Sequence, residues 1–298
     1  MTSSVFVTIA GRTNAGKSSL LNSIIGEKIA SVSSKPQTTR TRITGILTRN
    51  ELQMVFMDTP GLHKARNKLG EQMNRTARES VSDMDLILYV KDCTKKFSDE
   101  ETELLDSINM KRQPVVLVLN KIDLLERKES LFEMINSAGE RWAFAETVPI
   151  SVTRNDGIEE LLSVCAKYAK EAPHYFPDDK FTDQPETIIA AELIREKLLR
   201  YLRDEVPHGV AVGIEKFRER NDKDLLDVEA VIYCERASHK GIIIGKGGET
   251  LKKISTSARA ELENFFRIQV NLRCWVKVAD NWRTKDNMIH RFGLDGTK

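Results

Sequence analysis

The sequence predicts an α/β protein in which a doubly wound, mostly parallel sheet is followed by a smaller α+β domain. Two observations predict this fold class: short apolar strands alternate with amphipathic helices over residues 5–170, and a different order of elements follows a proline-rich break at 173–186. A length of 298 residues suits about two domains. We therefore expect a first domain at 1–172, a linker at 173–186 and a second domain at 187–298.

The strands of the first domain are expected at 5–10, 43–48, 53–58, 86–91, 115–120 and 147–150. Several are nearly continuous apolar runs, which is typical of a sheet covered by helices on both faces. The helices between them are expected at 17–25, 67–80, 99–108, 131–142 and 158–172. This alternation predicts parallel strands joined by helical crossovers.

The linker carries three of the eight prolines and the pair Asp178-Asp179. An amphipathic helix is then expected at 187–205, because its apolar residues recur at helical spacing. Strands at 210–217 and 225–234, helices at 239–244 and 249–265, and a last strand at 268–278 complete the order α-β-β-α-α-β. We find no internal repeat.

Charge is distributed unevenly along the chain. Residues 236–298 hold 13 Lys and Arg against 6 Asp and Glu, a balance of +7, whereas the whole chain carries only +2. A basic end on an otherwise acidic chain favours a polyanionic partner for that end. Four widely spaced cysteines and the lack of a long apolar run favour a cytosolic protein without disulfides, a zinc site or a transmembrane segment.

The first expected strand ends in G-R-T-N-A-G-K-S, and a helix follows at once. This is the pattern G-x-x-x-x-G-K-[ST], whose backbone N–H groups and helix N-terminus hold phosphates. Lys17 would reach the β- and γ-phosphates, and Ser18 would give its hydroxyl to Mg²⁺. The residues expected around the phosphates are Gly11, Arg12, Thr13, Asn14, Ala15, Gly16, Lys17 and Ser18.

Two further motifs follow expected strands. D-T-P-G places Asp58 near the Mg²⁺ and brings Thr59, Pro60 and Gly61 to the γ-phosphate. N-K-I-D places Asp123 where its carboxylate accepts hydrogen bonds from N1–H and the N2 amino group of guanine, groups that adenine lacks. Asn120, Lys121 and Ile122 complete that motif. Three such motifs at the carboxyl ends of strands predict a site for GTP and GDP.

Two polar segments are assigned from their order alone. Ser151, Val152 and Thr153 follow the last expected strand of the first domain, where a backbone N–H would meet the guanine oxygen. In the polar segment 33–42, a threonine would bind Mg²⁺ only while the γ-phosphate is present. Thr39 is our choice for this ligand and Thr38 is the alternative.

Leu62 follows D-T-P-G, at a position where a glutamine would orient the attacking water. A leucine cannot hydrogen-bond water, so catalysis needs another source of charge. Our hypothesis is that the Asn14 side chain holds a monovalent cation such as K⁺ against the phosphates. We expect Lys17, Asn14, Thr39 and Gly61 to act in slow hydrolysis of GTP.

A second glycine-rich turn, G-K-G-G at 245–248, lies between two expected helices of the second domain. Glycines let a nucleic-acid backbone approach closely, Lys246 adds charge, and bases would lie on Ile242, Ile243 and Ile244. This pattern in the order α-β-β-α-α-β predicts a type II KH domain, which holds about four nucleotides of single-stranded RNA or DNA.

These residues together resemble the Era family of bacterial GTPases. The resemblance rests on G-R-T-N-A-G-K-S-S-L-L-N, Q-T-T-R, D-T-P-G-L, N-K-I-D, Y-F-P-D-D, I-R-E-K-L-L-R and I-I-G-K-G-G-E-T-L-K-K-I. It implies a P-loop GTPase domain and a KH domain, Mg²⁺ dependence and a role in assembling the small ribosomal subunit. It further implies binding near the 3′ end of 16S ribosomal RNA, favoured by GTP, and peripheral association with the inner face of the cell membrane.

The resemblance also implies an RNA contact for the turn, namely Ile242, Ile243, Ile244, Gly245, Lys246, Gly247, Gly248 and Lys252. We expect a monomer. The match is weaker past Trp282, so no RNA contact is assigned there. Two alternatives stay open: a membrane-associated signalling GTPase whose second domain docks protein, and an RNA-binding scaffold in which GTP is purely structural.

Overall fold

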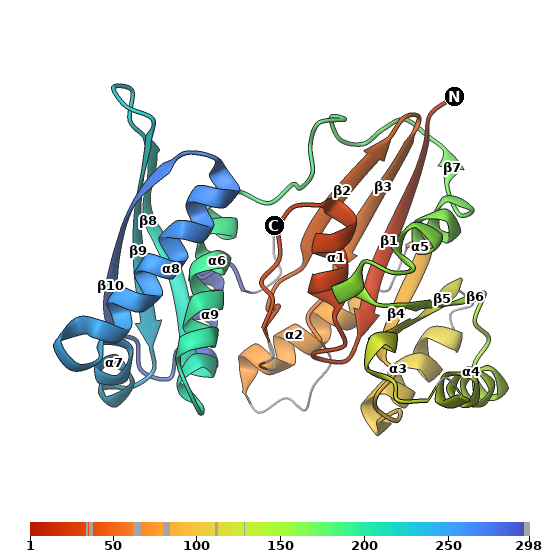
Figure 1. Ribbon diagram of the computed structural model, residues 1–298. Coiled ribbons are helices and arrows are strands. Elements are labelled where there is room, and N and C mark those ends of the chain that lie inside the picture. The colour runs from red at the N-terminus through yellow and green to blue at the C-terminus, as the bar shows by residue number, and fades with distance from the viewer. Residues whose placement is uncertain are drawn as a thin grey trace. The chain divides into compact units, whose positions relative to one another are not determined.

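The computed structural model describes residues 1–33, 35, 38–61, 67–79, 84–110, 113–127 and 129–294. The chain forms two compact units, each with its own sheet (Figure 1). The first comprises Met1–Ile29, Thr39–Ala65 and Gly70–Asp183, and the second comprises Ala30–Thr38, Arg66–Leu69 and Gln184–Lys298. In the described part of the chain, no helix is long and apolar enough to cross a membrane.

A seven-stranded sheet forms the centre of the first unit, with the order β2-β3-β1-β4-β5-β6 and β7 beside β1. Neighbouring strands are parallel except that β2 is antiparallel to β3 and β7 is antiparallel to β1. The strands are β1 (Ser3–Gly11), β2 (Ile43–Arg49), β3 (Leu52–Asp58), β4 (Leu86–Asp92), β5 (Val115–Asn120), β6 (Glu146–Ile150) and β7 (Lys170–Glu171). The predicted doubly wound, mostly parallel sheet is confirmed.

Helices cover both faces of this sheet, which is why its strands are apolar throughout. The helices are α1 (Lys17–Ile25), α2 (Lys68–Glu79), α3 (Asp99–Met110), α4 (Glu129–Arg141) and α5 (Ile158–Ala166). Side chains of α2, α3 and α4 share one core cluster with alternate residues of β4 and β5. The α1 and α5 helices pack against β1, β2, β3 and β6.

One predicted element of the first unit is wrong at its end. A helix was expected to run to residue 172, but α5 ends at Ala166 and Lys170–Glu171 forms β7. β7 pairs with Ser3 and Ser4 of β1, on the side where β4 pairs with β1 only from Val7 onward. The first residues of β1 thus have backbone groups that need a partner, and β7 supplies it.

The predicted linker region packs on the first unit as far as residue 183. The side chain of Gln53 accepts hydrogen bonds from the backbone N–H groups of Tyr175 and Phe176, at 2.8 and 3.0 Å. Further along, the backbone carbonyl of Phe181 accepts from the N–H of Ile46 at 2.9 Å. These contacts order a segment whose sequence shows only a break in the pattern.

The second unit has the order α-β-β-α-α-β, as predicted. Its elements are α6 (Glu186–Tyr201), β8 (Val210–Glu219), β9 (Leu225–Cys234), α7 (Ala237–Ile244), α8 (Glu249–Phe266) and β10 (Gln269–Val278). β9 is the central strand, antiparallel to β8 and parallel to β10. Apolar side chains of α6, α7 and α8 form one core with alternate residues of the three strands. The predicted KH fold of type II is confirmed.

A further short helix, α9 (Asp286–Arg291), was not predicted. Trp282, fully buried, donates its indole N–H to the carbonyl of Gly209 at 2.9 Å. Phe292 packs against both Trp282 and Tyr233, with ring centroids 5.2 and 4.8 Å apart. The segment after β10 is therefore part of the second unit.

Candidate functional site

The predicted nucleotide motifs meet at one edge of the first sheet. β1 leads into the glycine-rich loop, β3 ends at Asp58, β5 ends at Asn120 and β6 ends just before Ser151. These strands all run in the same direction, because every neighbouring pair from β3 through β1, β4 and β5 to β6 is parallel. Their carboxyl ends therefore lie at the same edge of the sheet. Open α/β sheets bind ligands at this edge.

The glycine-rich loop is held closely by the neighbouring motif. Asn120 donates from Nδ2 to the carbonyl oxygen of Ala15 at 2.9 Å. Gly16 has φ of +102°, and a Cβ there would lie 2.2 Å from Asn120 Nδ2, so only glycine fits. Lys17 is buried, and its ammonium donates to the carbonyl of Arg12 at 3.0 Å. The loop is thus closed around the position that the phosphates would take.

Three oxygen-bearing side chains gather beside this loop. The Ser18 hydroxyl donates to Asp58 Oδ2 at 2.6 Å, and it lies 2.6 Å from the Thr39 hydroxyl. Thr39 in turn lies 3.3 Å from Asp58 Oδ2. The other carboxylate oxygen, Asp58 Oδ1, is buried and has no hydrogen-bond partner among the residues that the structure describes. Such a donor set, all oxygen with one unsatisfied carboxylate oxygen, fits a hard cation such as Mg²⁺.

Burial shifts the pKa values of Lys17 and Asp58 in opposite directions. Burial lowers the pKa of Lys17, and the nearby Asp58 carboxylate partly offsets this shift. Burial likewise raises the pKa of Asp58, against the opposing effects of Lys17, Ser18 and Thr39. Phosphates beside Lys17 and a dication beside Asp58 would each favour the charged form.

Thr38 does not join this cluster. Its hydroxyl donates to the carbonyl of Lys35 at 2.7 Å. Of the two threonines considered from the sequence, Thr39 is the one that the fold brings to Ser18 and Asp58.

A second group of side chains surrounds Asp123. Ser151 donates its hydroxyl to Asp123 Oδ1 at 2.6 Å, and Thr153 donates to Oδ2 at 3.3 Å. The hydrogen bond from Ser151 is the main cause that lowers the pKa of Asp123. Nearby, the N–H of Val152 donates to Asn120 Oδ1 at 3.3 Å. An ionised carboxylate can only accept hydrogen bonds, and guanine offers it two donors, N1–H and the N2 amino group.

Lys121 ties the guanine motif to the glycine-rich loop. Its ammonium donates to the carbonyl of Asn14 at 2.9 Å and to Asp92 Oδ2 at 2.6 Å. Asp92 was not predicted from the sequence. Asp92 ends β4 in the same way that Asp58 ends β3, so its position after an apolar strand was the available signal.

The D-T-P-G turn lies against the glycine-rich loop. Thr59 donates its hydroxyl to the carbonyl of Ile9 at 3.0 Å, and Pro60 is buried. A Cβ on Gly61 would lie 2.8 Å from the Thr13 Cα, so the two segments touch through backbone atoms. Leu62, predicted to follow them at the γ-phosphate, lies outside the described residues.

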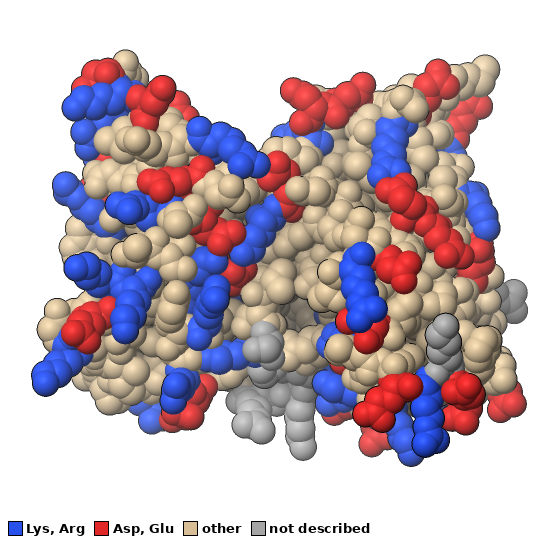
Figure 2. Space-filling view, viewed as in Figure 1, with Lys and Arg blue, Asp and Glu red and all other residues tan. Residues whose placement is uncertain are grey.

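The G-K-G-G turn of the second unit lies between α7 and α8. Gly245, Gly247 and Gly248 all have positive φ, at 74°, 59° and 83°. The side chain of Lys246 is exposed, as is that of Lys252 on the first turns of α8. Figure 2 shows Lys and Arg side chains gathered over the α7 and α8 side of this unit. An exposed glycine turn with nearby cations suits close approach of a phosphate backbone.

The three isoleucines before this turn have different environments. Ile242 is 50% exposed, whereas Ile243 is fully buried in the core and Ile244 is partly buried against it. Successive helix positions point in directions about 100° apart, so three adjacent residues cannot share one face. Of the three predicted contacts, only Ile242 presents a largely exposed side chain.

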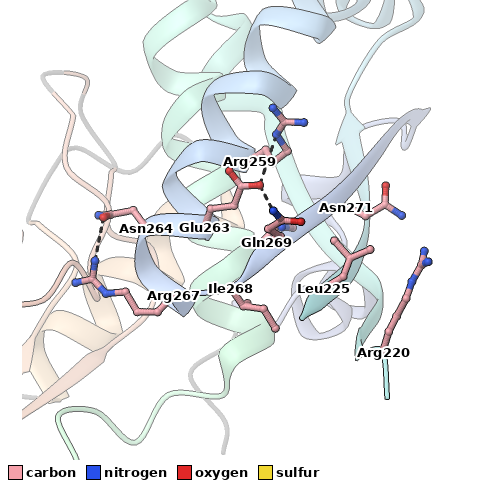
Figure 3. A pocket seen from close by; sticks show the side chains of 10 residues that line it. Arg220, Leu225, Arg259, Glu263, Asn264, Arg267, Ile268, Gln269 and Asn271 are labelled. Carbon is pink, nitrogen blue, oxygen red and sulfur yellow. Dashed lines mark hydrogen bonds and ion pairs between the residues drawn. The ribbon is translucent and has the colours of Figure 1, made fainter. Parts of the chain in front are cut away.

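A hollow of about 1000 Å³ lies at the other end of α8 (Figure 3). Its guanidinium groups are already engaged: Arg220 with Asp227, Arg259 with Glu263, and Arg267 with Asn264. Glu263 also accepts from the N–H of Val270 at 3.2 Å. The bond from Val270 joins α8 to the start of β10, and the pair of Arg220 and Asp227 joins the end of β8 to β9. The pairs of Arg259 with Glu263 and of Arg267 with Asn264 are local to α8.

Comparison with protein families identifies both domains. Residues 6–121 match the family described as 50S ribosome-binding GTPase, and residues 205–283 match the KH domain family. GTPase Era of Clostridioides difficile (strain 630) is 51% identical over 295 residues, covering 99% of each chain. GTPase Era of Clostridium acetobutylicum is 46% identical over 298 residues and covers all of both chains.

Two solved structures match nearly the whole chain, each with a TM-score of 0.94 and 35% identity. One is a variant of Era from Aquifex aeolicus bound to GDP·AlF₄⁻, covering 98% of this chain and 99% of the other. The second is Era in complex with MgGDPNP and nucleotides 1506–1542 of 16S ribosomal RNA, covering 99% of both. With both domains, both glycine-rich turns and the guanine motif in place, the chain belongs to the Era family of GTPases, which are GTP hydrolases with a C-terminal KH domain.

Proposed function

We propose that this protein is a GTP-dependent RNA-binding switch that acts in assembly of the small ribosomal subunit. One observation carries the nucleotide half: Ser18, Thr39 and Asp58 lie within hydrogen-bond distance of one another beside a closed glycine-rich loop. The G-K-G-G turn on a KH fold supports the RNA half. The relative that binds a 16S ribosomal RNA fragment is 35% identical over nearly the full chain.

At the nucleotide, each side chain has one role in the proposal. The loop Gly11–Ser18 holds the phosphates through its N–H groups, and Lys17 neutralises their charge. Ser18 and Thr39 give hydroxyl oxygens to Mg²⁺, and Asp58 lies beside the metal. Mg²⁺ would supply charge stabilisation for the transferred phosphoryl group. Guanine is held by Asp123, with Asn120, Lys121, Ile122, Ser151 and Val152 around it.

For catalysis, we propose that the Asn14 side chain holds a monovalent cation. Its backbone has φ of 64°, a conformation that asparagine tolerates, and its carbonyl is fixed by Lys121. Turnover would then be faster in K⁺ than in Na⁺ at equal ionic strength. Equal rates in the two salts would remove the cation from the mechanism.

RNA is proposed to bind across the G-K-G-G turn, with Ile242, Lys246 and Lys252 beside the clamped backbone. Ile243 is left out of this contact because it belongs to the core. We propose domain boundaries at 1–172 and 187–298, with 173–186 as the linker. Peripheral association with the cytoplasmic membrane face is a further part of the proposal, and vesicle flotation with anionic lipids tests it.

The decisive experiment measures RNA affinity of the full chain at fixed salt, with GDP and with a non-hydrolysable GTP analogue. A 16S ribosomal RNA fragment that matches nucleotides 1506–1542 is the probe. We expect tighter binding with the analogue, and linkage requires that RNA raise the affinity for the analogue by the same factor. Equal RNA affinity in both states would contradict a switch.

A second measurement separates the remaining candidate functions. GTP turnover that rises when RNA is added would exclude a scaffold in which GTP is purely structural. Gly247→Asp adds a negative charge at the turn, where a Cβ meets nothing within 4 Å. Loss of RNA binding in this variant supports the KH contact, whereas unchanged binding favours a domain that docks protein.

A further inference from the structure

Helices α6, α7 and α8 pack on one face of the sheet of the second unit, and on the opposite face Arg291 of α9 and Phe292 contact Tyr233. Val270 and Val276 of β10 belong to the core that α6 and α8 share. Side chains alternate along a strand, so Arg273, Trp275 and Lys277, each an odd number of positions from Val270 and Val276, point to the opposite face. β10 is also an edge strand. We call these three residues the β10 stripe.

Trp275 stands out among the tryptophans of this chain. It is 43% exposed, whereas Trp142 and Trp282 are 5% and 0% exposed. The same face holds Tyr233, which is covered by Phe292, the residue that follows α9. The chain thus covers one aromatic side chain of this face and leaves 43% of the Trp275 surface exposed, at a cost in hydration free energy.

The two neighbours of Trp275 in the stripe are cations. Arg273 is exposed and makes no hydrogen bond or ion pair with any residue that the structure describes. Among the described residues Lys277 makes one ion pair, with Glu215 at 3.4 Å, and both side chains are about half exposed. Exposed pairs of this kind contribute little. Both cations are therefore available to an anionic partner.

Acidic side chains on this face already have partners. Glu229 is paired with Arg273 in the strand register but lies 3.9 Å from Lys216. Asp227 accepts from Arg220 and Asn271 at 2.8 Å. Opposite Trp275 in the register is Val231, which is uncharged. The indole thus lies between two cations without an acidic side chain directly across from it.

We propose that the β10 stripe is a second RNA contact, separate from the G-K-G-G turn, in which a base stacks on Trp275. Arg273 and Lys277 would contact the phosphates on either side of that base. Stripe residues recur every two positions, about 6.6 Å apart along a strand, which allows each to meet a different part of an extended strand of RNA. Aromatic stacking between cations is how proteins hold single-stranded RNA without reading its sequence.

This inference rests on the proposed function, that the second unit binds RNA, and extends its RNA surface beyond the turn. A KH turn holds about four nucleotides, so a longer RNA needs further contacts. The cations favour RNA over an apolar protein segment, and the exposed indole favours a single strand over a duplex, whose bases are stacked on one another.

The test uses the fluorescence of the intact chain, because Trp275 is far more exposed than the other two of its three tryptophans. Acrylamide quenches exposed indoles, so most of the quenching should come from Trp275 and should vanish in Trp275→Phe. Adding the 16S ribosomal RNA fragment with the GTP analogue should protect Trp275 from acrylamide. Unchanged quenching at saturating RNA would overturn the inference.

Affinity measurements give a second, independent readout. Trp275→Ala should weaken RNA binding about tenfold, whereas Trp275→Phe should keep most of the affinity. Arg273→Gln and Lys277→Gln should each lower the slope of log affinity against log salt by about 0.7, as expected for one contact to a single strand. Tyr201→Ala, an exposed aromatic side chain outside the stripe, is the control and should leave affinity unchanged.

Gly247→Asp separates this inference from the proposed function. If Gly247→Asp abolishes RNA binding while the stripe variants bind normally, the stripe is not an RNA contact and the proposed function stands. If neither Gly247→Asp nor the stripe variants change RNA affinity, both are wrong. Protection of Trp275 by raised protein concentration without RNA would identify a surface for self-association and would also overturn the inference.

Discussion

Asp123 shows how single residues define this site. Its two carboxylate oxygens accept from Ser151 and Thr153, and these bonds orient it without neutralising it. A carboxylate in this position accepts hydrogen bonds from guanine and has nothing to offer adenine. Thr39 is a second case, because its hydroxyl lies 2.6 Å from Ser18 while the adjacent Thr38 bonds to its own loop.

Replacing the carboxylate tests the choice of purine. Asp123→Asn should weaken GTP and GDP binding by roughly a hundredfold or more, since hydrogen bonds to a charged group contribute about 1.5–3 kcal/mol each. Titration with fluorescent GDP and competition with ATP measure the effect. Glu126→Gln, the same chemical change on a nearby exposed side chain, should have no effect. Unaltered preference for guanine in Asp123→Asn would contradict the site.

The pH dependence of nucleotide binding follows from the lowered pKa of Asp123. The Ser151 hydroxyl favours the ionised carboxylate, so the charged form persists below the ordinary pKa of 3.8. Affinity for GDP should therefore stay flat from pH 7 down to about 4 and fall only below it. In Ser151→Ala this fall should begin at a higher pH. Identical pH profiles for the two proteins would show that Ser151 does not tune Asp123.

At the scale of elements, α3 is joined to the sheet by a buried charge pair. Lys91 of β4 donates to Glu101 of α3 at 3.1 Å, and both side chains are 1% exposed. Glu101 also accepts from the N–H of Ser98 at 2.9 Å, which caps the start of the helix. One carboxylate therefore serves both the helix and its packing.

Removing this charge should be costly. Glu101→Gln would leave Lys91 buried without its counter-charge and should lower the free energy of unfolding by about 3–5 kcal/mol. Urea unfolding followed by circular dichroism measures the change. Glu103→Gln, on an exposed position of the same helix, should change stability by less than about 0.5 kcal/mol. A similar small effect for Glu101→Gln would show that the pair contributes little.

At the scale of the whole molecule, the segment Ala30–Thr38 belongs to the second unit, although the residues before and after it in the chain belong to the first unit. Ser31 donates its hydroxyl to Glu192 of α6 at 2.8 Å, and the N–H of Val32 donates to Glu196 at 2.9 Å. Arg195 of the same helix donates to the carbonyl of Thr38. Thr39, a predicted Mg²⁺ ligand, is thus joined by one peptide bond to a segment that is hydrogen-bonded to α6.

This continuity predicts that α6 contributes to the coupling between nucleotide and RNA. Ser31→Ala removes one anchor of the segment and should reduce the ratio of RNA affinities between the GTP-analogue and GDP states. RNA titrations in both states measure this ratio. Ser137→Ala on α4 removes a hydroxyl that bonds within its own helix, so it should leave this ratio of RNA affinities unchanged. An unchanged ratio in Ser31→Ala would show that this anchor plays no part in the coupling.

The fold class and the motifs of both sites follow from the amino-acid sequence. Apolar runs that end in Asp58 or Asn120, and glycines spaced as in Gly11–Ser18, are local patterns whose geometry follows from chain direction and the lack of a Cβ. For this reason the strands, the order of the second domain and the positions of both glycine-rich turns could be predicted.

Which of several equivalent side chains reaches a given point depends on the tertiary structure. Thr39 rather than Thr38 faces Ser18, Ile243 enters the core while Ile242 does not, and Lys170–Glu171 pairs as a strand because part of β1 lacks a neighbour. Each outcome depends on residues far apart in the chain. Their contacts set burial and hydrogen bonding, which local pattern does not contain.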